Sequence, residues 1–298
     1  MNASLLTTSK WLQAATKQLE EAGIGTARLD CLVLLEDATG KDRSWLLAHP
    51  DFIVQGPTLK TLEKQIARRA GHEPLAYIRG KTEFYGREFS VNKDVLEPRP
   101  ESETIIDLLK QIMEGGRWKV EGGEKTAGAS CIIDIGTGCG CLAITAKLEL
   151  PSLNVLATDI SKKCLLIAAK NAKKLRGDVD FFQGNLLKAL PPSTFHLPTT
   201  ILANLPYVPD NYQVSQAAMN EPKLAIFGGP DGLDLYRKLF HQIANLPVSR
   251  SIVLTESLPF QHDELAKIAN KAGYTLHKTE DFIQVFSLNN LTRRRKMC

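Results

Sequence analysis

From Cys131 onward, short apolar segments rich in β-branched residues alternate with longer segments of helical periodicity. This alternation constrains the fold most, because strands separated by helices form a parallel sheet that is covered on both faces. The last two strand segments have no helix between them, which predicts an antiparallel hairpin at the sheet edge. We therefore predict an α/β fold, a doubly wound, seven-stranded and mostly parallel sheet. Its strands are expected near 131–135, 154–158, 179–183, 200–204, 251–256, 273–279 and 282–288, and its helices near 139–149, 161–175, 232–245 and 260–271.

The N-terminal part of the chain has a different pattern. Apolar residues at helical spacing precede Gly23, recur over 27–38 and again over 58–69, which predicts a small helical bundle within residues 1–75. No catalytic cluster marks this bundle, so a recognition module and a plain structural appendage both remain open.

Residues 76–100 form a predicted linker. Within it, Phe84–Val91 has the pattern of a β-hairpin and Asn92–Asp94 that of a turn. A helix is expected over 104–113, after two prolines, followed by a flexible glycine-rich loop over 115–130. The sheet domain then extends over 101–298.

Composition excludes several classes of protein. A hydrophobic content of 43% and a charged content of 23% are typical of a globular chain, and no apolar run approaches the ~20 residues of a membrane span. We expect a cytoplasmic protein with no membrane association. The net charge of +4 is mild and demands no nucleic-acid partner, and the basic cluster at 293–296 is expected to be a solvated tail. A monomer is the default, because no additional apolar stripe is present.

The six cysteines show neither a C-x-x-C pair nor a histidine at metal-ligand spacing. Cys139 and Cys141 are separated by one residue, which suits neither a zinc knuckle nor an easy disulfide. We expect reduced thiols and no metal site.

A strand runs into a glycine-rich turn and then a helix at Ile132–Gly140. The spacing D-x-G-x-G-x-G differs from the G-x-G-x-x-G dinucleotide fingerprint, and the Gly-Lys-Ser/Thr of a phosphate-binding loop is missing. Asp159, at the end of the next strand, can accept hydrogen bonds from both hydroxyls of a ribose. A ligand with an amino acid end and a ribose end but no phosphate fits this layout, which predicts S-adenosylmethionine as the cofactor. The residues expected at the turn are Asp134, Gly136, Thr137, Gly138, Cys139 and Gly140.

Two further residues are expected beside the adenine. Asn185 and Leu186 follow the third strand, where the amide of Asn185 is expected to hydrogen-bond the base amine and Leu186 to pack on the ring.

The apolar segment Ile201–Ala203 leads into Asn204-Leu205-Pro206-Tyr207. This motif follows the C-terminal end of a predicted strand, where open α/β sheets bind ligands. The amide of Asn204 offers a carbonyl oxygen and two N–H donors, and Pro206 fixes the direction of the neighbouring carbonyls. Tyr207 supplies an aromatic wall. These groups can hold a planar, weakly nucleophilic nitrogen, either an amide or an exocyclic amine. Asn204 is also expected to contact the cofactor.

Three further blocks resemble the peptide chain release factor glutamine methyltransferases, which methylate the side-chain nitrogen of the glutamine in a Gly-Gly-Gln motif. General methyltransferases share the glycine turn but not these blocks, and the resemblance covers most of the chain. The blocks are Gly71–Gly80 with Glu83–Gly86, Leu96–Glu103, and Glu221–Pro222 with Gly228–Tyr236.

The resemblance implies a class I, Rossmann-like methyltransferase domain preceded by a substrate-recognition domain. It also implies class I release factors as the protein substrate, with no direct need for nucleic acid. Asn204, Leu205, Pro206 and Tyr207 are then the catalytic residues. Asn204 Oδ1 and the Leu205 carbonyl are expected to accept the two N–H hydrogens of the substrate amide.

The chain departs from the family pattern at four positions. The family usually has Asn-Pro-Pro-Tyr, and Leu205 stands at its first proline, as in ribosomal RNA adenine dimethyltransferases. Asn185 replaces a common Asp, Leu186 a frequent aromatic residue, and Glu97 an apolar one. An N-methyltransferase acting on adenine or guanine of RNA or DNA therefore remains an alternative. A non-catalytic scaffold that binds the cofactor is a second one.

Overall fold

The computed structural model describes residues 6–115, 131–196, 199–246 and 251–289. It divides into two compact units: Met1–Lys81 with Val214–Asn220, and Thr82–Gln213 with Glu221–Cys298. Residues 116–130 of the loop expected over 115–130 and the basic tail at 293–296 lie outside the described residues, while Gly115 ends a helix. Cys31, Cys131, Cys139, Cys141 and Cys164 are free thiols, while Cys298 also lies outside that part of the chain.

The first unit is the predicted helical bundle. Buried leucines from three helices, among them Leu19, Leu35 and Leu62, form its core. A buried ion pair joins Arg69 Nε to Asp30 Oδ2 at 2.6 Å. Two short helices and a two-stranded pair were not predicted, because elements of two to six residues carry too few positions to show a period. The elements are α1 Thr8–Glu21, α2 Ala27–Thr39, α3 Arg43–Ala48, α4 Gly56–Ala70 and α5 Leu75–Arg79, with β1 Leu6–Thr7 paired to β2 Ile53–Val54.

The second unit contains the predicted seven-stranded sheet, in the order β10-β11-β9-β8-β5-β6-β7. Strands β5 to β9 run parallel to one another, and β11 pairs antiparallel with both β9 and β10, so that β10 and β11 form the predicted antiparallel hairpin at the edge. All seven strands lie where the apolar pattern placed them. They are β5 Cys131–Ile135, β6 Asn154–Asp159, β7 Asp180–Gln183, β8 Thr199–Ala203, β9 Ser251–Glu256, β10 Tyr274–Glu280 and β11 Ile283–Leu288.

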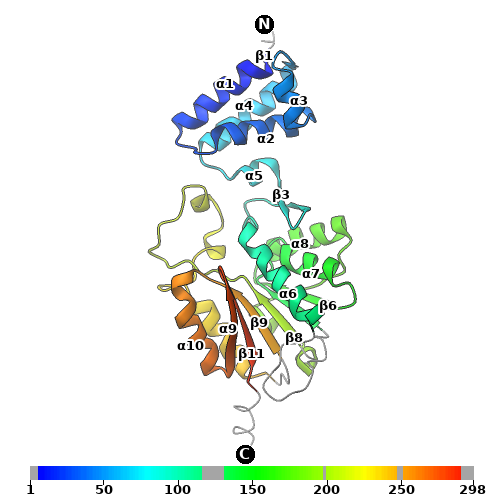
Figure 1. Ribbon diagram of the computed structural model, residues 1–298, viewed down its shortest axis with the longest axis vertical. Coiled ribbons are helices and arrows are strands. Elements are labelled where there is room, and N and C mark those ends of the chain that lie inside the picture. Colours follow the sequence, from blue (N-terminus) through cyan, green and yellow to red (C-terminus); the bar gives the residue numbers. More distant parts are fainter. Residues whose placement is uncertain (1–5, 116–130, 197–198, 247–250, 290–298) are drawn as a thin grey trace, which may run out of the picture. The chain divides into compact units, whose positions relative to one another are not determined.

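Alternate residues of each central strand enter two separate cores, as expected for a sheet covered on both faces. Ile133 and Ile201 pack against α9 and α10, whereas Ile132 and Leu202 pack against α6 and α7 (Figure 1). The helices are α6 Glu103–Gly115, α7 Cys141–Glu149, α8 Lys162–Leu175, α9 Asp234–Ala244 and α10 His262–Lys271.

The hairpin of the linker lies slightly earlier than predicted. Its strands are β3 Lys81–Phe84 and β4 Arg87–Ser90, so the hairpin begins before Phe84. Tyr85 and Gly86 turn the chain with φ angles of 52° and 68°. The Tyr-Gly pair was missed because the apolar pattern continues across it. The predicted turn at 92–94 is confirmed by a hydrogen bond from Asp94 N to Asn92 Oδ1 of 2.8 Å.

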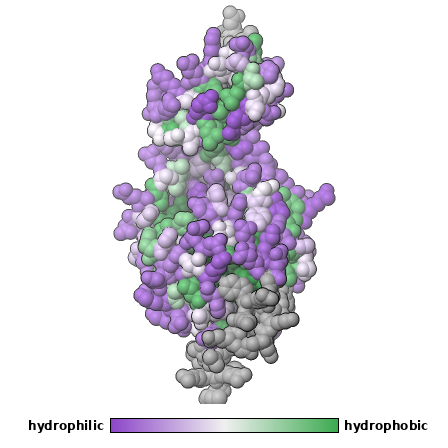
Figure 2. Space-filling view, viewed as in Figure 1, coloured by the Kyte–Doolittle hydropathy of each residue, from purple (hydrophilic) through white to green (hydrophobic). Residues whose placement is uncertain are grey.

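Hydrophilic residues cover most of the face of each unit in Figure 2, with apolar residues scattered between them. Within the described ranges, none of the helices has the length and apolar character needed to cross a membrane.

Candidate functional site

The predicted site residues follow neighbouring strands of the sheet at their carboxyl ends. Asp134 lies in β5, Asp159 ends β6, and Asn204 directly follows β8. Strands β5 and β8 are adjacent in the sheet although two strands, β6 and β7, and two helices, α7 and α8, lie between them in the sequence, so the order of the strands reverses at this point. Open α/β sheets bind ligands at such a switch point. The glycine turn and the asparagine motif therefore meet at the place where a ligand is expected.

The glycine turn after β5 is held by hydrogen bonds from both ends. The N–H groups of Gly136 and Thr137 donate to Thr158 O at 2.8 and 2.9 Å. Asp134 accepts from Thr137 Oγ1 at 2.6 Å and from Ala143 N at 3.2 Å. The carboxyl group is fully enclosed, and burial raises its pKa to about 7. Asp134 thus ties the turn to the first turn of α7.

The three glycines of this turn have φ angles of 72°, 57° and 86° at Gly136, Gly138 and Gly140, which residues with a Cβ adopt at a cost. Gly140 is the left-handed N-cap of α7, so the helix begins at Cys141 rather than at the predicted residue 139. Cys139 is buried, and its carbonyl accepts from Asn171 Nδ2 at 2.9 Å. These contacts fix the path of the turn.

Asp159 lies beside the turn, as predicted. Its Oδ2 accepts from Gly138 N at 2.9 Å and its Oδ1 from Ser161 N at 2.8 Å. The side chain is 8% exposed, and desolvation by burial raises its pKa. Each oxygen of a carboxylate has two lone pairs, so the group retains acceptor capacity for the hydroxyls of a ligand.

Asn185 and Leu186 follow β7, next to Asp159, whose carbonyl accepts from Gly184 N at 3.0 Å. The side chain of Asn185 is exposed and that of Leu186 is buried in the core cluster shared with β5 and β8. Leu186 has a φ of 54°, which is uncommon for a residue with a branched side chain.

The asparagine motif emerges from β8 with each side chain in a different environment. Leu205 is 2% exposed and packs in the core, and a Cβ added to Gly136 would lie 3.1 Å from its Cδ2. Leu205 N donates to the Tyr236 hydroxyl at 3.3 Å. Pro206 and Tyr207 are partly buried. The motif therefore lies directly against the glycine turn.

Two residues outside the predicted site, Ser102 and Glu256, contact the side chains of Asn204 and Tyr207. Asn204 Nδ2 donates to Ser102 Oγ at 2.8 Å, and Ser102 Oγ donates to Glu256 Oε2 at 2.6 Å. The Tyr207 hydroxyl donates to Glu256 Oε1 at 3.1 Å. Glu256 ends β9 and is 1% exposed. The sequence signal that could have identified Glu256 is an acidic residue at the end of a predicted buried strand.

Ionisation in this cluster is governed by burial. Desolvation raises the pKa of Glu256 to about 7, against the opposing effect of the hydrogen bonds from Ser102, Tyr207 and Asn204. Burial, and then the charge of Glu256, raise the pKa of Tyr207. The Tyr207 hydroxyl therefore stays protonated at neutral pH and acts as a donor.

The loop that contains the glycine-rich block covers the backbone of the motif. A Cβ on Gly228 would overlap the Pro206 carbonyl oxygen, and one on Gly232 would overlap that of Tyr207. Gln261 Nε2 donates to Tyr207 O at 2.8 Å and to Asp231 O at 2.7 Å. Only glycine permits this close approach of two backbones.

A second block is joined to the first by an ion pair. Arg99 Nη2 lies 2.6 Å from Oε1 of the buried Glu221. Glu97 N donates to the other oxygen of Glu221 at 3.3 Å. The segment that delivers Ser102 is thus anchored to the residues that follow the motif.

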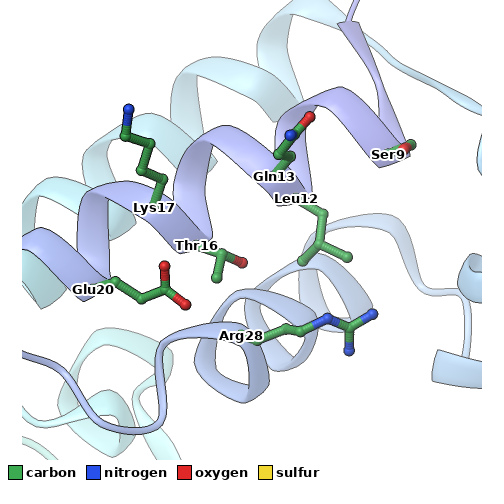
Figure 3. Close-up of a pocket in the computed structure, with 7 residues that line it drawn as sticks. All are labelled: Ser9, Leu12, Gln13, Thr16, Lys17, Glu20 and Arg28. Carbon is green, nitrogen blue, oxygen red and sulfur yellow. The ribbon is translucent and has the colours of Figure 1, made fainter.

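An open groove lies within the first unit. Its volume is about 500 Å³, and its lining comes from α1 and α2 (Figure 3). Its charged lining residues are Lys17 and Glu20 from α1 and Arg28 from α2. None of the predicted site residues belongs to this groove.

Comparison with known proteins gives two family matches. Residues 10–80 match the PrmC N-terminal domain, and residues 124–221 match the methyltransferase small domain. The release factor glutamine methyltransferase of Koribacter versatilis is 36% identical over 244 residues, which cover 80% of this chain and 81% of the relative. That of Coxiella burnetii is 33% identical over 251 residues, covering 84% and 85%. A bifunctional methyltransferase of Rickettsia bellii is 30% identical over 295 residues, and the match covers 92% of this chain and 52% of the length of that relative.

Proposed function

Since this chain belongs to the release factor glutamine methyltransferase family, we propose that it methylates the N5 amide nitrogen of a glutamine in class I peptide chain release factors. The glutamine is the one in the Gly-Gly-Gln motif, and S-adenosylmethionine is the methyl donor. The observation that carries this proposal is the direct packing of Leu205 against Gly136, which joins the asparagine motif to the glycine turn.

The residues around the glycine turn fit the cofactor. The buried Asp159 has acceptor capacity left for the two ribose hydroxyls. The N-terminal turn of α7, together with Gly136 to Gly140, favours the carboxylate of an amino acid. The exposed amide of Asn185 suits the adenine amine, whereas the side chain of Leu186 is buried in the core and offers the ring little surface. Asn204 contacts the cofactor from the motif side. When bound, the cofactor supplies an electrophilic methyl group on a sulfonium.

The substrate nitrogen must be positioned rather than strongly activated, because the lone pair of an amide is delocalised. Asn204 Oδ1 and the Leu205 carbonyl oxygen accept its two N–H hydrogens and aim the nitrogen at the methyl group. Positioning of this kind can supply about 7–11 kcal/mol of a barrier. The oxygens also stabilise the positive charge that develops on the nitrogen. Pro206 and Tyr207 exclude water from one side, and the N–H proton is lost to solvent after the new bond has formed.

The replacement of the usual proline by Leu205 is compatible with this scheme. The peptide carbonyl of Leu205 remains as an acceptor, and its side chain fills the core beside Gly136. The helical bundle is the recognition module for the release factor. The reaction takes place in the cytoplasm, where release factors act on the ribosome, and the enzyme works as a monomer without nucleic acid.

The test is a radiolabelled methyl-transfer assay with a purified class I release factor. Its matched control is the same factor with Gln→Ala in the Gly-Gly-Gln motif. Label on the first and none on the second is the expected result. Label on neither, with transfer to ribosomal RNA instead, would favour the base-methylating alternative that Asn204-Leu205-Pro206-Tyr207 resembles. Absence of methyl transfer to any acceptor would favour the second alternative, a non-catalytic scaffold that binds the cofactor.

A further inference from the structure

We propose that Glu256 and Ser102 are positioning residues that orient the Asn204 amide, so that its carbonyl oxygen rather than its NH2 group faces the substrate. This inference rests on the proposed function, because the orientation of the amide matters only if Asn204 holds a nitrogen that carries hydrogens.

The hydrogen bonds of the cluster run in one direction. Asn204 Nδ2 donates to Ser102 Oγ at 2.8 Å, and Ser102 Oγ donates to Glu256 Oε2 at 2.6 Å. The hydroxyl of Tyr207 approaches the other oxygen of the carboxylate at 3.1 Å. Along the chain, Ser102 lies 102 residues before Asn204 and 154 residues before Glu256. Only the folded site brings them together.

The charge of Glu256 determines this direction. An ionised carboxylate only accepts hydrogen bonds, and a serine hydroxyl has a single hydrogen to donate. Once the Ser102 hydrogen points to Glu256, Ser102 Oγ can only accept from Asn204, and the atom of the amide that donates is Nδ2. Asn204 Oδ1 is then the oxygen that is presented to the substrate.

A protonated Glu256 removes this constraint. Its carboxyl group can donate to Ser102, whose hydrogen then turns toward the amide and selects Oδ1 as its partner. The NH2 group of Asn204 would face the substrate nitrogen, which offers hydrogens and not an acceptor. The amide in that orientation repels the N–H groups that it must hold.

Burial of the carboxylate without a cation supports a role beyond stability. Glu256 and Ser102 are 1% and 2% exposed, and among the described residues no lysine or arginine forms an ion pair with Glu256. An unpaired buried charge is costly, and such groups concentrate at functional sites. The side chains facing Glu256 are Ser102 and Glu101 from the segment before α6, Asn204 and Tyr207 after β8, and Tyr236 from α9, whose hydroxyl donates to the Glu256 carbonyl.

The titration of Glu256 makes the orientation sensitive to pH near neutrality. Burial raises the pKa of Glu256 to about 7, with a further increase from the charge of Glu101. The productive orientation of Asn204 requires the ionised form. Turnover should therefore rise with pH through about 7 and then level off.

The experiment compares wild-type enzyme with E256Q, S102A and S102T in steady-state methyl transfer from pH 6 to pH 8.5. The acceptor is whichever substrate the wild type labels, a class I release factor or ribosomal RNA, because an amide and an exocyclic amine both need an acceptor at Asn204. Failure of the release factor as a substrate therefore refutes the proposed function without deciding the role of Glu256. S-adenosylmethionine binding and thermal unfolding are measured for each variant.

We expect kcat of E256Q and S102A to fall about 10- to 100-fold, as for the loss of one preorganised dipole, while cofactor affinity changes less than about threefold. S102T keeps the hydroxyl and should retain kcat. The rise of kcat through pH 7 should disappear in E256Q. The matched control is D30N, which alters a buried carboxylate that is paired with Arg69 in the helical bundle, and it should keep the rise. A folded E256Q with wild-type kcat and an unchanged pH profile would overturn the proposal, as would an S102T variant as slow as S102A.

Discussion

At the scale of the residue, the proposed role of Asn204 in positioning the substrate can be tested separately from cofactor binding. Its neighbours Gly136 and Asp134 shape the turn through backbone geometry and a carboxylate, and neither depends on the Asn204 amide. Asn204 Nδ2 donates to Ser102 Oγ, which leaves the amide oxygen available for the proposed acceptance of a substrate N–H.

Replacement of Asn204 by alanine should therefore leave cofactor binding within a few fold and remove most of kcat. A loss of ~100-fold or more is expected, comparable to the removal of one preorganised dipole. Calorimetric titration with S-adenosylmethionine and a methyl-transfer assay check the two parts. Near-wild-type turnover would contradict the role of Asn204.

Leu205→Pro tests the departure from the family pattern. A proline has no N–H, so the hydrogen bond from Leu205 N to the Tyr236 hydroxyl is lost, and a buried side chain becomes smaller. We expect unfolding free energy to decrease by about 1–3 kcal/mol while kcat stays within about threefold, because the carbonyl at position 205 is retained. Urea denaturation and methyl transfer measure both. Leu205→Ala, which keeps the N–H, separates the hydrogen bond from the packing.

At the scale of the element, the loop after the motif acts as a brace for its backbone. Val208 N donates to Ile226 O at 3.0 Å and Gly228 N to Val208 O at 2.9 Å, so the loop pairs with the chain that leaves the motif. Gln261 joins both segments from the other side. The direction of the motif's carbonyls is thus set by residues that are distant along the chain.

Gly232→Ala should disturb this brace, because its Cβ would overlap the Tyr207 carbonyl and Gln261 Nε2. The control is Gly86→Ala, since Gly86 also has a positive φ, 68°, but has no heavy atom near its would-be Cβ. The control should cost about 1–2 kcal/mol of backbone strain and retain kcat. The Gly232 variant should lose more stability and most of its methyl transfer. Equal losses of stability and activity in the two variants would contradict the role of this loop in supporting the backbone of the motif.

At the scale of the whole molecule, the buried carboxyls make folding dependent on pH. Burial raises the pKa of Asp134 and Glu256 to about 7 and also raises that of Asp159. Their values in the unfolded chain are near 4. The folded protein therefore holds more protons than the unfolded chain between about pH 4 and 7. Stability from this source is complete below pH 4 and is lost as pH rises through 7.

We expect the unfolding free energy of the cofactor-free enzyme to be lower at pH 8 than at pH 5, by about 2 kcal/mol or more. Asp231, whose pKa the Arg237 guanidinium lowers to about 2, acts below this window and with the opposite sign. Urea unfolding at pH 5, 6, 7 and 8 measures the slope, and E256Q should reduce it. A slope of the opposite sign would show that these carboxyls are ionised at little cost.

The sequence by itself determined the elements of the sheet and the ends at which ligands bind. The period of apolar residues is local, so each strand from Cys131 to Leu288 could be located from its own residues. Asp134 lies near the end of β5, Asp159 ends β6, and Asn204 follows β8. Parallel strands bring such residues together at their carboxyl ends. That is why the turn and the motif were found, whereas short elements such as α3 and the exact position of the β3–β4 hairpin were not.

Only the tertiary structure decided which residues surround Asn204. Ser102 precedes α6 and Glu256 ends β9, and the order β9-β8-β5 places both beside the end of β8. No local pattern encodes this order, because it depends on how distant strands pair. The grouping of Val214–Asn220 with the helical bundle likewise has no local signal. Propensity and period act over a few residues, while the hydrogen bonds of Ser102 to Asn204 and Glu256 join segments more than one hundred residues apart.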